Sequence, residues 1–165
     1  MTNTLWVHGN AAQVQLPTVF ASYQYTTGGL YVAANVDEFD WLHIPLLAPM
    51  FTNDSQPRLL AVRARLHIQE GGIDQVSVSD GEAIVFQKSV DVIGGNVDFV
   101  MPSPHVVETG VALSIHIGHH AHGFEDGRTP MPFTLAAVGA DYDFLPVYFK
   151  KPGTPPFTPQ INPQA

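Results

Sequence analysis

The chain has 165 residues, no cysteine and a formal net charge of −8, which is enough for one domain with a sizeable core. A hydrophobic fraction of 45% with 13% charged residues excludes disorder for the bulk of the chain. Seven basic residues without a cluster exclude nucleic acid and anionic membranes as partners, and the lack of cysteine excludes disulfides and thiol nucleophiles.

Short strands are predicted along the whole chain. Before residue 50 they are expected at 5–8, 11–16, 19–25, 30–35 and 41–47. Apolar and basic residues alternate over 58–70, which predicts a strand that turns Leu60 and every second residue after it toward the core. Strands at 73–79 and 82–88 should form a hairpin at Asp80-Gly81.

Three more strands are expected in the second half of the chain. A strand at 97–101 should end at Pro102-Ser103-Pro104-His105, because proline donates no hydrogen bond to a ladder. Alternation over 111–117 and an apolar run over 133–144 predict the last two strands. About ten short strands with turn signals predict an all-β antiparallel sandwich of jelly-roll type, with a closed β-barrel as the alternative.

The domain organisation is predicted to be simple. Residues 1–149 should form the sandwich, and the proline-rich residues 150–165 should form an extended C-terminal arm. The first ten residues lack the basic and apolar regions of a signal peptide, and no 18-residue apolar run is present. Cytoplasmic location without membrane insertion is therefore expected by default.

Four short motifs look familiar as a set. They are Trp6-Val7-His8-Gly9, Trp41-Leu42-His43-Ile44-Pro45, Pro102-Ser103-Pro104-His105 and Gly139-Ala140-Asp141. Together they resemble a family of small bacterial all-β proteins classed as a domain of unknown function. The resemblance covers residues 5–144 and leaves 118–132 as an insertion. It implies an all-β fold and brings no activity with it.

A histidine-rich segment is the first candidate site. His119, His120, His122 and Glu125 lie close together in the sequence, and imidazole with carboxylate suits divalent transition metals. They are the candidate metal ligands of a jelly-roll enzyme. The alternative is a polar surface loop without metal, in which case no cofactor is expected.

An acidic and aromatic segment at 37–43 is the second candidate. Its three carboxylates beside an indole point to a calcium ion or a sugar, while burial of Trp41 in the core is the alternative. The candidate ligand-binding residues are Trp41, His43, Tyr23, Tyr25 and Tyr31. Ser103 and His105 are a further candidate pair for nucleophilic catalysis, but Pro-Ser-Pro is typical of a rigid turn.

These patterns favour a non-enzymatic all-β module for binding or assembly. Low charge suits burial in subunit contacts, so a homo-oligomer is expected, with a glycan or small molecule as a possible ligand. A lectin-like carbohydrate-binding module and a metal-dependent enzyme are the two alternatives.

Overall fold

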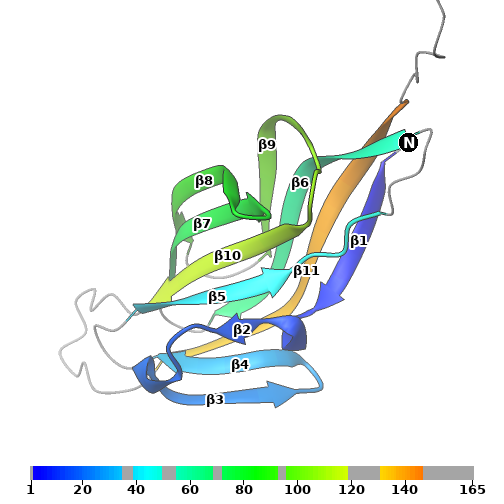
Figure 1. Cartoon of the computed structure of the whole chain (residues 1–165). Helices are drawn as coiled ribbons and strands as arrows, with labels where there is room; N and C mark the ends of the chain where they lie inside the picture. The colour runs from blue at the N-terminus through cyan, green and yellow to red at the C-terminus, as the bar shows by residue number, and fades with distance from the viewer. Residues whose placement is uncertain are drawn as a thin grey trace, which may run out of the picture.

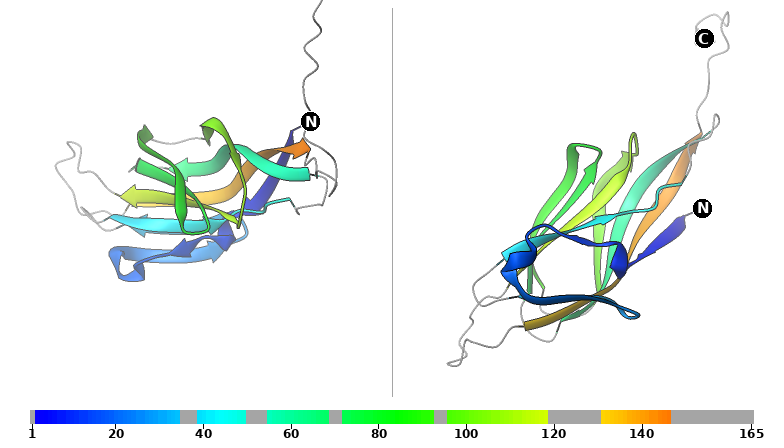
Figure 2. Two further views of the ribbon diagram at one scale, coloured as in Figure 1. Left: turned by 45° about the horizontal axis from the view of Figure 1, so that its top comes forward. Right: turned by 60° about the horizontal axis from the view of Figure 1, so that its bottom comes forward.

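A computed structural model describes residues 2–34, 39–49, 55–68, 72–92, 96–118 and 131–146. In this part of the chain eleven strands form two antiparallel sheets, six-stranded and five-stranded, that face each other (Figures 1 and 2). The predicted antiparallel sandwich is confirmed. The closed barrel is wrong, because the described strands divide into two separate sheets.

The six-stranded sheet has the order β3-β4-β11-β6-β9, and β1 also pairs with β11. Its strands are β3 (Phe20–Thr26), β4 (Gly29–Ala34), β11 (Met131–Pro146), β6 (Ser55–Ile68), β9 (Asn96–Val106) and β1 (Asn3–His8). At 16 residues β11 is long enough to pair with β4 along its first part and with β1 further on, both on the same side. β6 pairs with β11 along its other side.

The five-stranded sheet has the order β2-β5-β10-β7-β8. Its strands are β2 (Gln13–Val14), β5 (Phe39–Pro45), β10 (Val111–Gly118), β7 (Gly72–Asp80) and β8 (Ala83–Val92). Two short 3₁₀ turns, η1 (Gly9–Ala11) and η2 (Pro17–Val19), connect β1, β2 and β3. The central position of β10 decides which side chains meet on the outer face of this sheet.

The core lies between the two sheets, because alternate side chains of each strand point inward. The most deeply buried large side chains are Leu30, Val32, Leu42, Ile44, Leu59, Val62, Ile73, Val76, Leu113, Ile115, Leu135 and Tyr142. The inner side chains of β10 illustrate the pattern: Val111, Leu113, Ile115 and Ile117 are all buried. The outer faces of both sheets are therefore left for polar and aromatic residues.

Three local predictions are corrected. The strand at 97–101 does not stop at Pro102: β9 continues to Val106, and its residues 101–104 bulge out of the ladder opposite a single residue of β6. Because β9 is an edge strand, the missing proline N–H costs no ladder bond. The register of β6 shifts at the same point, so Leu59 is fully buried and Leu60 is only partly buried.

The strand expected at 11–16 shortens to the two residues of β2.

Several predictions fall outside the described residues. The metal-ligand candidates of residues 119–125 and the arm at 150–165 both lie there. The boundary between a sandwich domain and an arm at residue 150 therefore stays a prediction. In the part of the chain that the structure describes, no helix is long and apolar enough to cross a membrane.

Candidate functional site

β5 places three rings side by side on the outer face of the five-stranded sheet. Strand alternation turns Leu42 and Ile44 into the core, so Phe39, Trp41 and His43 point outward and are partly exposed. Trp41 is therefore not a core residue, and the alternative in which it is buried in the core is wrong.

The neighbouring strand β10 completes this group of rings. Its register places Ser114 opposite His43 and His116 opposite Trp41. Because Leu113 and Ile115 are buried, Ser114 and His116 share the outer face with the rings of β5.

Phe39, Trp41, His43 and His116 form one aromatic cluster. The ring centroids of Trp41 and His116 lie 4.7 Å apart, and those of Phe39 and His116 lie 5.7 Å apart with nearly parallel planes. The Trp41 and His43 rings are also nearly parallel, with centroids 6.5 Å apart. The result is a continuous aromatic surface across two strands.

Hydrogen bonds fix both imidazoles of the cluster. His43 Nδ1 lies 2.8 Å from Ser114 Oγ, and His116 Nδ1 lies 2.5 Å from Asp74 Oδ1. Asp74 reaches His116 because the register between β7 and β10 shifts there, which leaves Asp74 as an extra residue of β7. Such a bulge re-aims a side chain, and here it supplies a carboxylate to the cluster.

Uncharged polar side chains border the aromatic cluster. The ladder places Gln13 beside His43 and Ser77 beside Ser114, with Gln87 one strand further on. A second row continues from His116 to Gln75 and Ser89. The described residues of this face include no lysine or arginine, and Asp74 is the carboxylate on it. This face offers amide, hydroxyl and imidazole groups beside apolar rings.

The structure separates the five candidate ligand-binding residues into three places. Trp41 and His43 lie together in the aromatic cluster. Tyr23 and Tyr25 form an edge-to-face pair on β3, with ring centroids 6.4 Å apart, at the margin of the other sheet. Tyr31 pairs with Gln24 and points to the opposite face of that sheet from Leu30 and Val32. The described ring contacts join Tyr23 to Tyr25 and Trp41 to His43, and none joins a tyrosine to Trp41.

The acidic part of the segment at 37–43 also differs from the prediction. Asp40 points to the face opposite Trp41 and is buried, where its Oδ2 accepts a hydrogen bond from the Leu16 N–H at 2.8 Å. It anchors the connection between β2 and β3, so it does not stand beside the indole as a ligand for calcium or sugar. Asp37 and Glu38 lie outside the described residues.

Ser103 and His105 do not form a catalytic pair. His105 Nε2 lies 3.0 Å from Asp80 Oδ2, and no hydrogen bond is described between His105 and Ser103. Asp80 also accepts the N–H groups of Glu108, Thr109 and Gly110. Burial opposes ionisation of Asp80, but these donors outweigh it and lower its pKa. Asp80 and His105 therefore hold the 107–110 turn.

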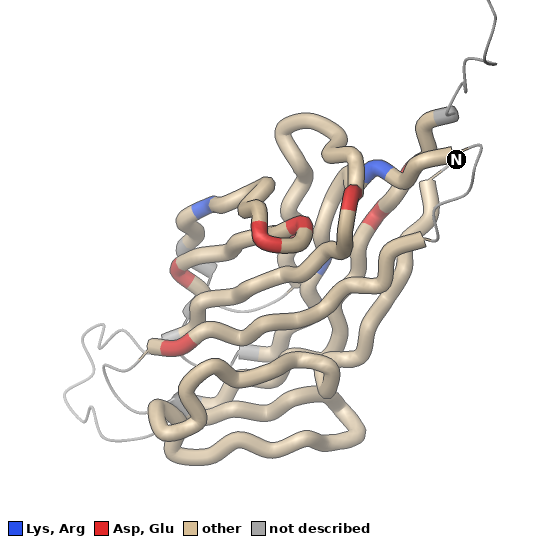
Figure 3. Tube along the Cα trace, viewed as in Figure 1, with Lys and Arg blue, Asp and Glu red and all other residues tan. Residues whose placement is uncertain are grey.

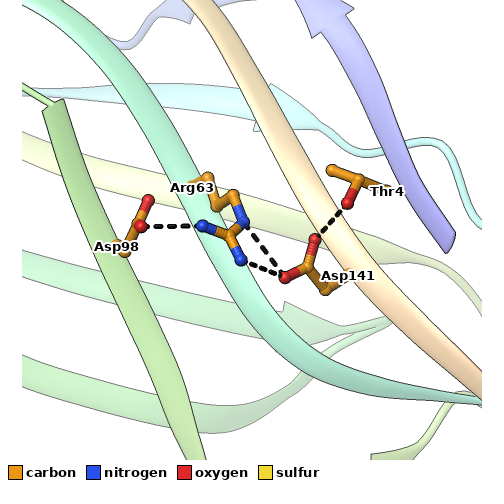
Figure 4. A network of polar contacts seen from close by, with 4 residues as sticks. All are labelled: Thr4, Arg63, Asp98 and Asp141. Atoms are coloured by element: carbon orange, nitrogen blue, oxygen red, sulfur yellow. Dashed lines mark hydrogen bonds and ion pairs between the residues drawn. The ribbon is translucent and has the colours of Figure 1, made fainter. Parts of the chain in front are cut away.

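The outer face of the six-stranded sheet has a different character. Arg63 joins Asp98, at 2.7 Å, and Asp141, at 2.6 Å, and the Thr4 hydroxyl donates to the other oxygen of Asp141 (Figure 4). Trp6 on this face packs over Gly139 with the Arg65 guanidinium 5.2 Å from its ring. The described charged side chains of this network pair with one another, so they are already occupied by ion pairs within the protein.

A metal centre is not found in the described part of the chain, where no three histidine or acidic side chains are grouped to hold an ion. His119, His120, His122 and Glu125 lie outside that part, and their role as metal ligands stays a prediction.

The sequence interpretation missed Phe39, Ser114, His116 and Asp74 as members of the site. The outward parity of Phe39, Ser114 and His116 was readable from the alternation in their own strands. The pairing of β5 with β10 was not readable, because His43 and Ser114 are 71 residues apart. The bulge that brings in Asp74 has no sequence signal that we recognise.

Comparisons with known proteins support the fold. No family model matches the chain, and no curated protein matches its sequence. The resemblance to the bacterial all-β family therefore stays a prediction.

Among solved structures, one similar chain is CBM86, described as a low-affinity xylan-binding module from the gut symbiont Roseburia intestinalis. It has a TM-score of 0.52 at 10% identity, with 87% of this chain and 96% of that chain covered. At this identity the likeness shows a shared β-sandwich fold.

Two further structures are more distant. The xylan-binding module CBM15 has a TM-score of 0.46 at 12% identity and covers 86% of this chain and 97% of its own. A family two carbohydrate esterase from Cellvibrio japonicus has a TM-score of 0.44 at 13% identity, covering 90% of this chain and 37% of its own.

Proposed function

We propose that the protein is a non-enzymatic binding module that holds an uncharged glycan on the outer face of its five-stranded sheet. The observation that carries the proposal is the aromatic cluster of Phe39, Trp41, His43 and His116, partly exposed and bordered by amides and hydroxyls.

The chemistry of a sugar fits this surface. A pyranose ring has an apolar C–H face and a rim of hydroxyl groups, so it needs an apolar surface with hydrogen-bonding groups around it. The aromatic cluster provides the apolar surface. The hydrogen-bonding groups around it come from Gln13, Gln75, Gln87 and Ser89. Indole is suited to such a boundary because it combines a large apolar body with one polar group.

The charge of the surface favours neutral over acidic glycans. Acidic glycans are recognised by lysine and arginine, which the described part of this face lacks, and the whole chain carries a net charge of −8. Asp74 adds a further negative group beside His116. We therefore expect pectin and other uronic acid polymers to be repelled.

Binding is favoured over hydrolysis by the polar groups of this face. Glycoside hydrolysis uses a pair of carboxylates, and Asp74 is the one carboxylate that the described residues place here. Ester hydrolysis is disfavoured by the partners of the two histidines. A serine nucleophile needs a histidine that a third group orients. His43 contacts Ser114, but the nearby carboxylate of Asp74 contacts His116 instead, so the described residues do not assemble a triad. The pairs fix ring positions, which is what a preformed binding surface needs.

Affinity electrophoresis tests the proposal. Gels would contain soluble xylan, because a module with this fold is described as xylan-binding, or galactomannan, or pectin as the acidic control. We expect a neutral polysaccharide to retard the wild-type protein. Trp41→Ala should weaken binding about tenfold, equivalent to ~1.4 kcal/mol.

Trp6→Ala is the matched control, because Trp6 lies on the outer face of the other sheet. It should bind like the wild type. A protein that no neutral polysaccharide retards, or equal losses in the two variants, would show that the aromatic cluster is not a glycan site.

A further inference from the structure

Edge strands of a sandwich expose unpaired backbone groups, and most edges of this protein are protected. Bulging prolines interrupt β9, Lys88 lies on β8, and β2 has only two residues. β1 pairs with the same side of β11 as β4 does, and β3 lies one strand further out than either of them. Among the described strands, β3 has none of these protections apart from a register shift between Phe20 and Ser22, near its start.

β3 is also well suited to pair with another strand. Its seven residues, Phe20–Thr26, contain neither proline nor a charged side chain. β4 pairs with one side of β3, and no described strand pairs with the other. Every second residue therefore directs its N–H and C=O away from the sheet. Phe, Tyr and Thr favour extended backbone, which keeps this edge ordered.

The charge distribution points to a second copy of the chain as the partner. The first 36 residues contain no Asp, Glu, Lys or Arg, although the whole chain has a net charge of −8. Figure 3 shows β2, β3 and β4 as a region without charged residues. Two copies repel each other elsewhere on their surfaces, but they can approach along β3 without like charges meeting.

Exposed apolar side chains extend this edge. Tyr23 and Tyr25 in β3 are 44% and 52% exposed, and Leu16, which precedes the turn η2 that leads into β3, is 56% exposed. The Tyr25 hydroxyl reaches the Ala12 carbonyl oxygen at 3.4 Å, which holds its ring beside the edge. A partner strand would cover part of this surface together with the backbone.

We infer that two copies of this chain pair their β3 strands antiparallel about a twofold axis. The two six-stranded sheets then join into one continuous sheet. Each copy uses its β3 edge once, so the assembly closes at a dimer. Side chains that meet across the axis come from the uncharged set of β3, which suits cross-strand contact. The glycan-binding proposal concerns the other sheet and does not depend on this inference.

Light scattering after size-exclusion chromatography tests the inference with two matched variants. Ser22→Lys places a charge on β3, and Ser103→Lys places the same charge on β9, the other edge of the same sheet. We expect the wild type and Ser103→Lys to have twice the mass of one chain, and Ser22→Lys to have the mass of one. A monomeric wild type at every concentration, or a dimeric Ser22→Lys, would overturn the inference.

Cross-linking decides the question if Ser22→Lys fails to fold. The chain has no cysteine, so each variant Ser22→Cys, Tyr23→Cys and Gln24→Cys carries a single thiol. In a twofold antiparallel pair one residue faces its own copy within about 5 Å. At least one of the three should cross-link with a short bis-maleimide, and Ser103→Cys should not. Equal yields in all four variants would contradict a β3 interface.

Discussion

Arg63 shows how single residues hold the outer face of the six-stranded sheet. Its guanidinium bridges two carboxylates of very different exposure, since the Asp141 side chain is 8% exposed and that of Asp98 is 50% exposed. The hydrogen bond from Arg63 and a second one from Thr4 stabilise the Asp141 carboxylate, and they lower its pKa despite burial. Arg58 lowers the pKa of Asp143 in the same way nearby.

Asp141→Asn should therefore destabilise the protein much more than Asp98→Asn. Asp141→Asn should lower the free energy of unfolding by about 2 kcal/mol, because it alters the buried partner of a charged group. Asp98→Asn should lower it by about 0.5 kcal/mol, because Asp98 is exposed. Urea denaturation at neutral pH measures both. Equal losses would show that burial does not set the strength of these pairs.

The cost of Asp141→Asn should also depend on pH. The pKa of Asp141 in the folded protein lies below its unfolded value of about 3.9. The stabilisation of the fold by the ionised Asp141 is therefore complete at pH values above the unfolded pKa. It is lost as the pH falls through the folded pKa. The difference in unfolding free energy between wild type and Asp141→Asn should be constant near neutrality and shrink below about pH 4. A difference that persists in acid would contradict this assignment.

Among the secondary-structure elements, the 3₁₀ turn η1 depends on one close backbone approach. A Cβ atom added at Gly9 would lie 1.7 Å from the Leu135 carbonyl oxygen of β11. The contact lies between backbones, so neither side can rotate away. η1 leads directly into β2, which pairs with His43 of the proposed site.

Gly9→Ala is therefore expected to cost about 3 kcal/mol of stability, since the backbone of β11 or η1 must move. Gly110→Ala is the control, because a Cβ atom there meets nothing within 4 Å. It should leave the stability unchanged within about 0.5 kcal/mol. Thermal denaturation of both variants is the measurement, and a wild-type melting temperature for Gly9→Ala would refute the predicted clash.

Strands with regular alternation could be predicted from the sequence. β5, β10 and most of β6 follow the expected pattern because one face of each is buried and the other is not. The continuation of β9 beyond Pro102 was missed, because the sequence does not show that β9 lies at an edge where proline is tolerated. The inward orientation of Leu59 was missed because of the same bulge, which shifts the register between β6 and β9.

At the scale of the whole molecule, the two outer faces have opposite chemistry. Paired charges and Trp6 cover the six-stranded sheet, while neutral polar groups and the aromatic cluster cover the five-stranded sheet. The sequence indicated Trp41, His43, Tyr23, Tyr25 and Tyr31 as candidate binding residues, and the structure places Trp41 and His43 on β5 and the tyrosines on β3 and β4. Which strands become neighbours depends on long-range topology, which local periodicity does not encode.

Tryptophan fluorescence tests the glycan site most directly, because the chain has two tryptophans on opposite faces. Trp6→Phe leaves Trp41 as the only indole, and Trp41→Phe leaves Trp6. Each variant would be titrated with the neutral polysaccharide that retards the wild-type protein. We predict that the ligand shifts the emission of Trp41 in Trp6→Phe and leaves the emission of Trp6 in Trp41→Phe unchanged. Binding to Trp6→Phe without any change in Trp41 emission would contradict a glycan site on the five-stranded sheet.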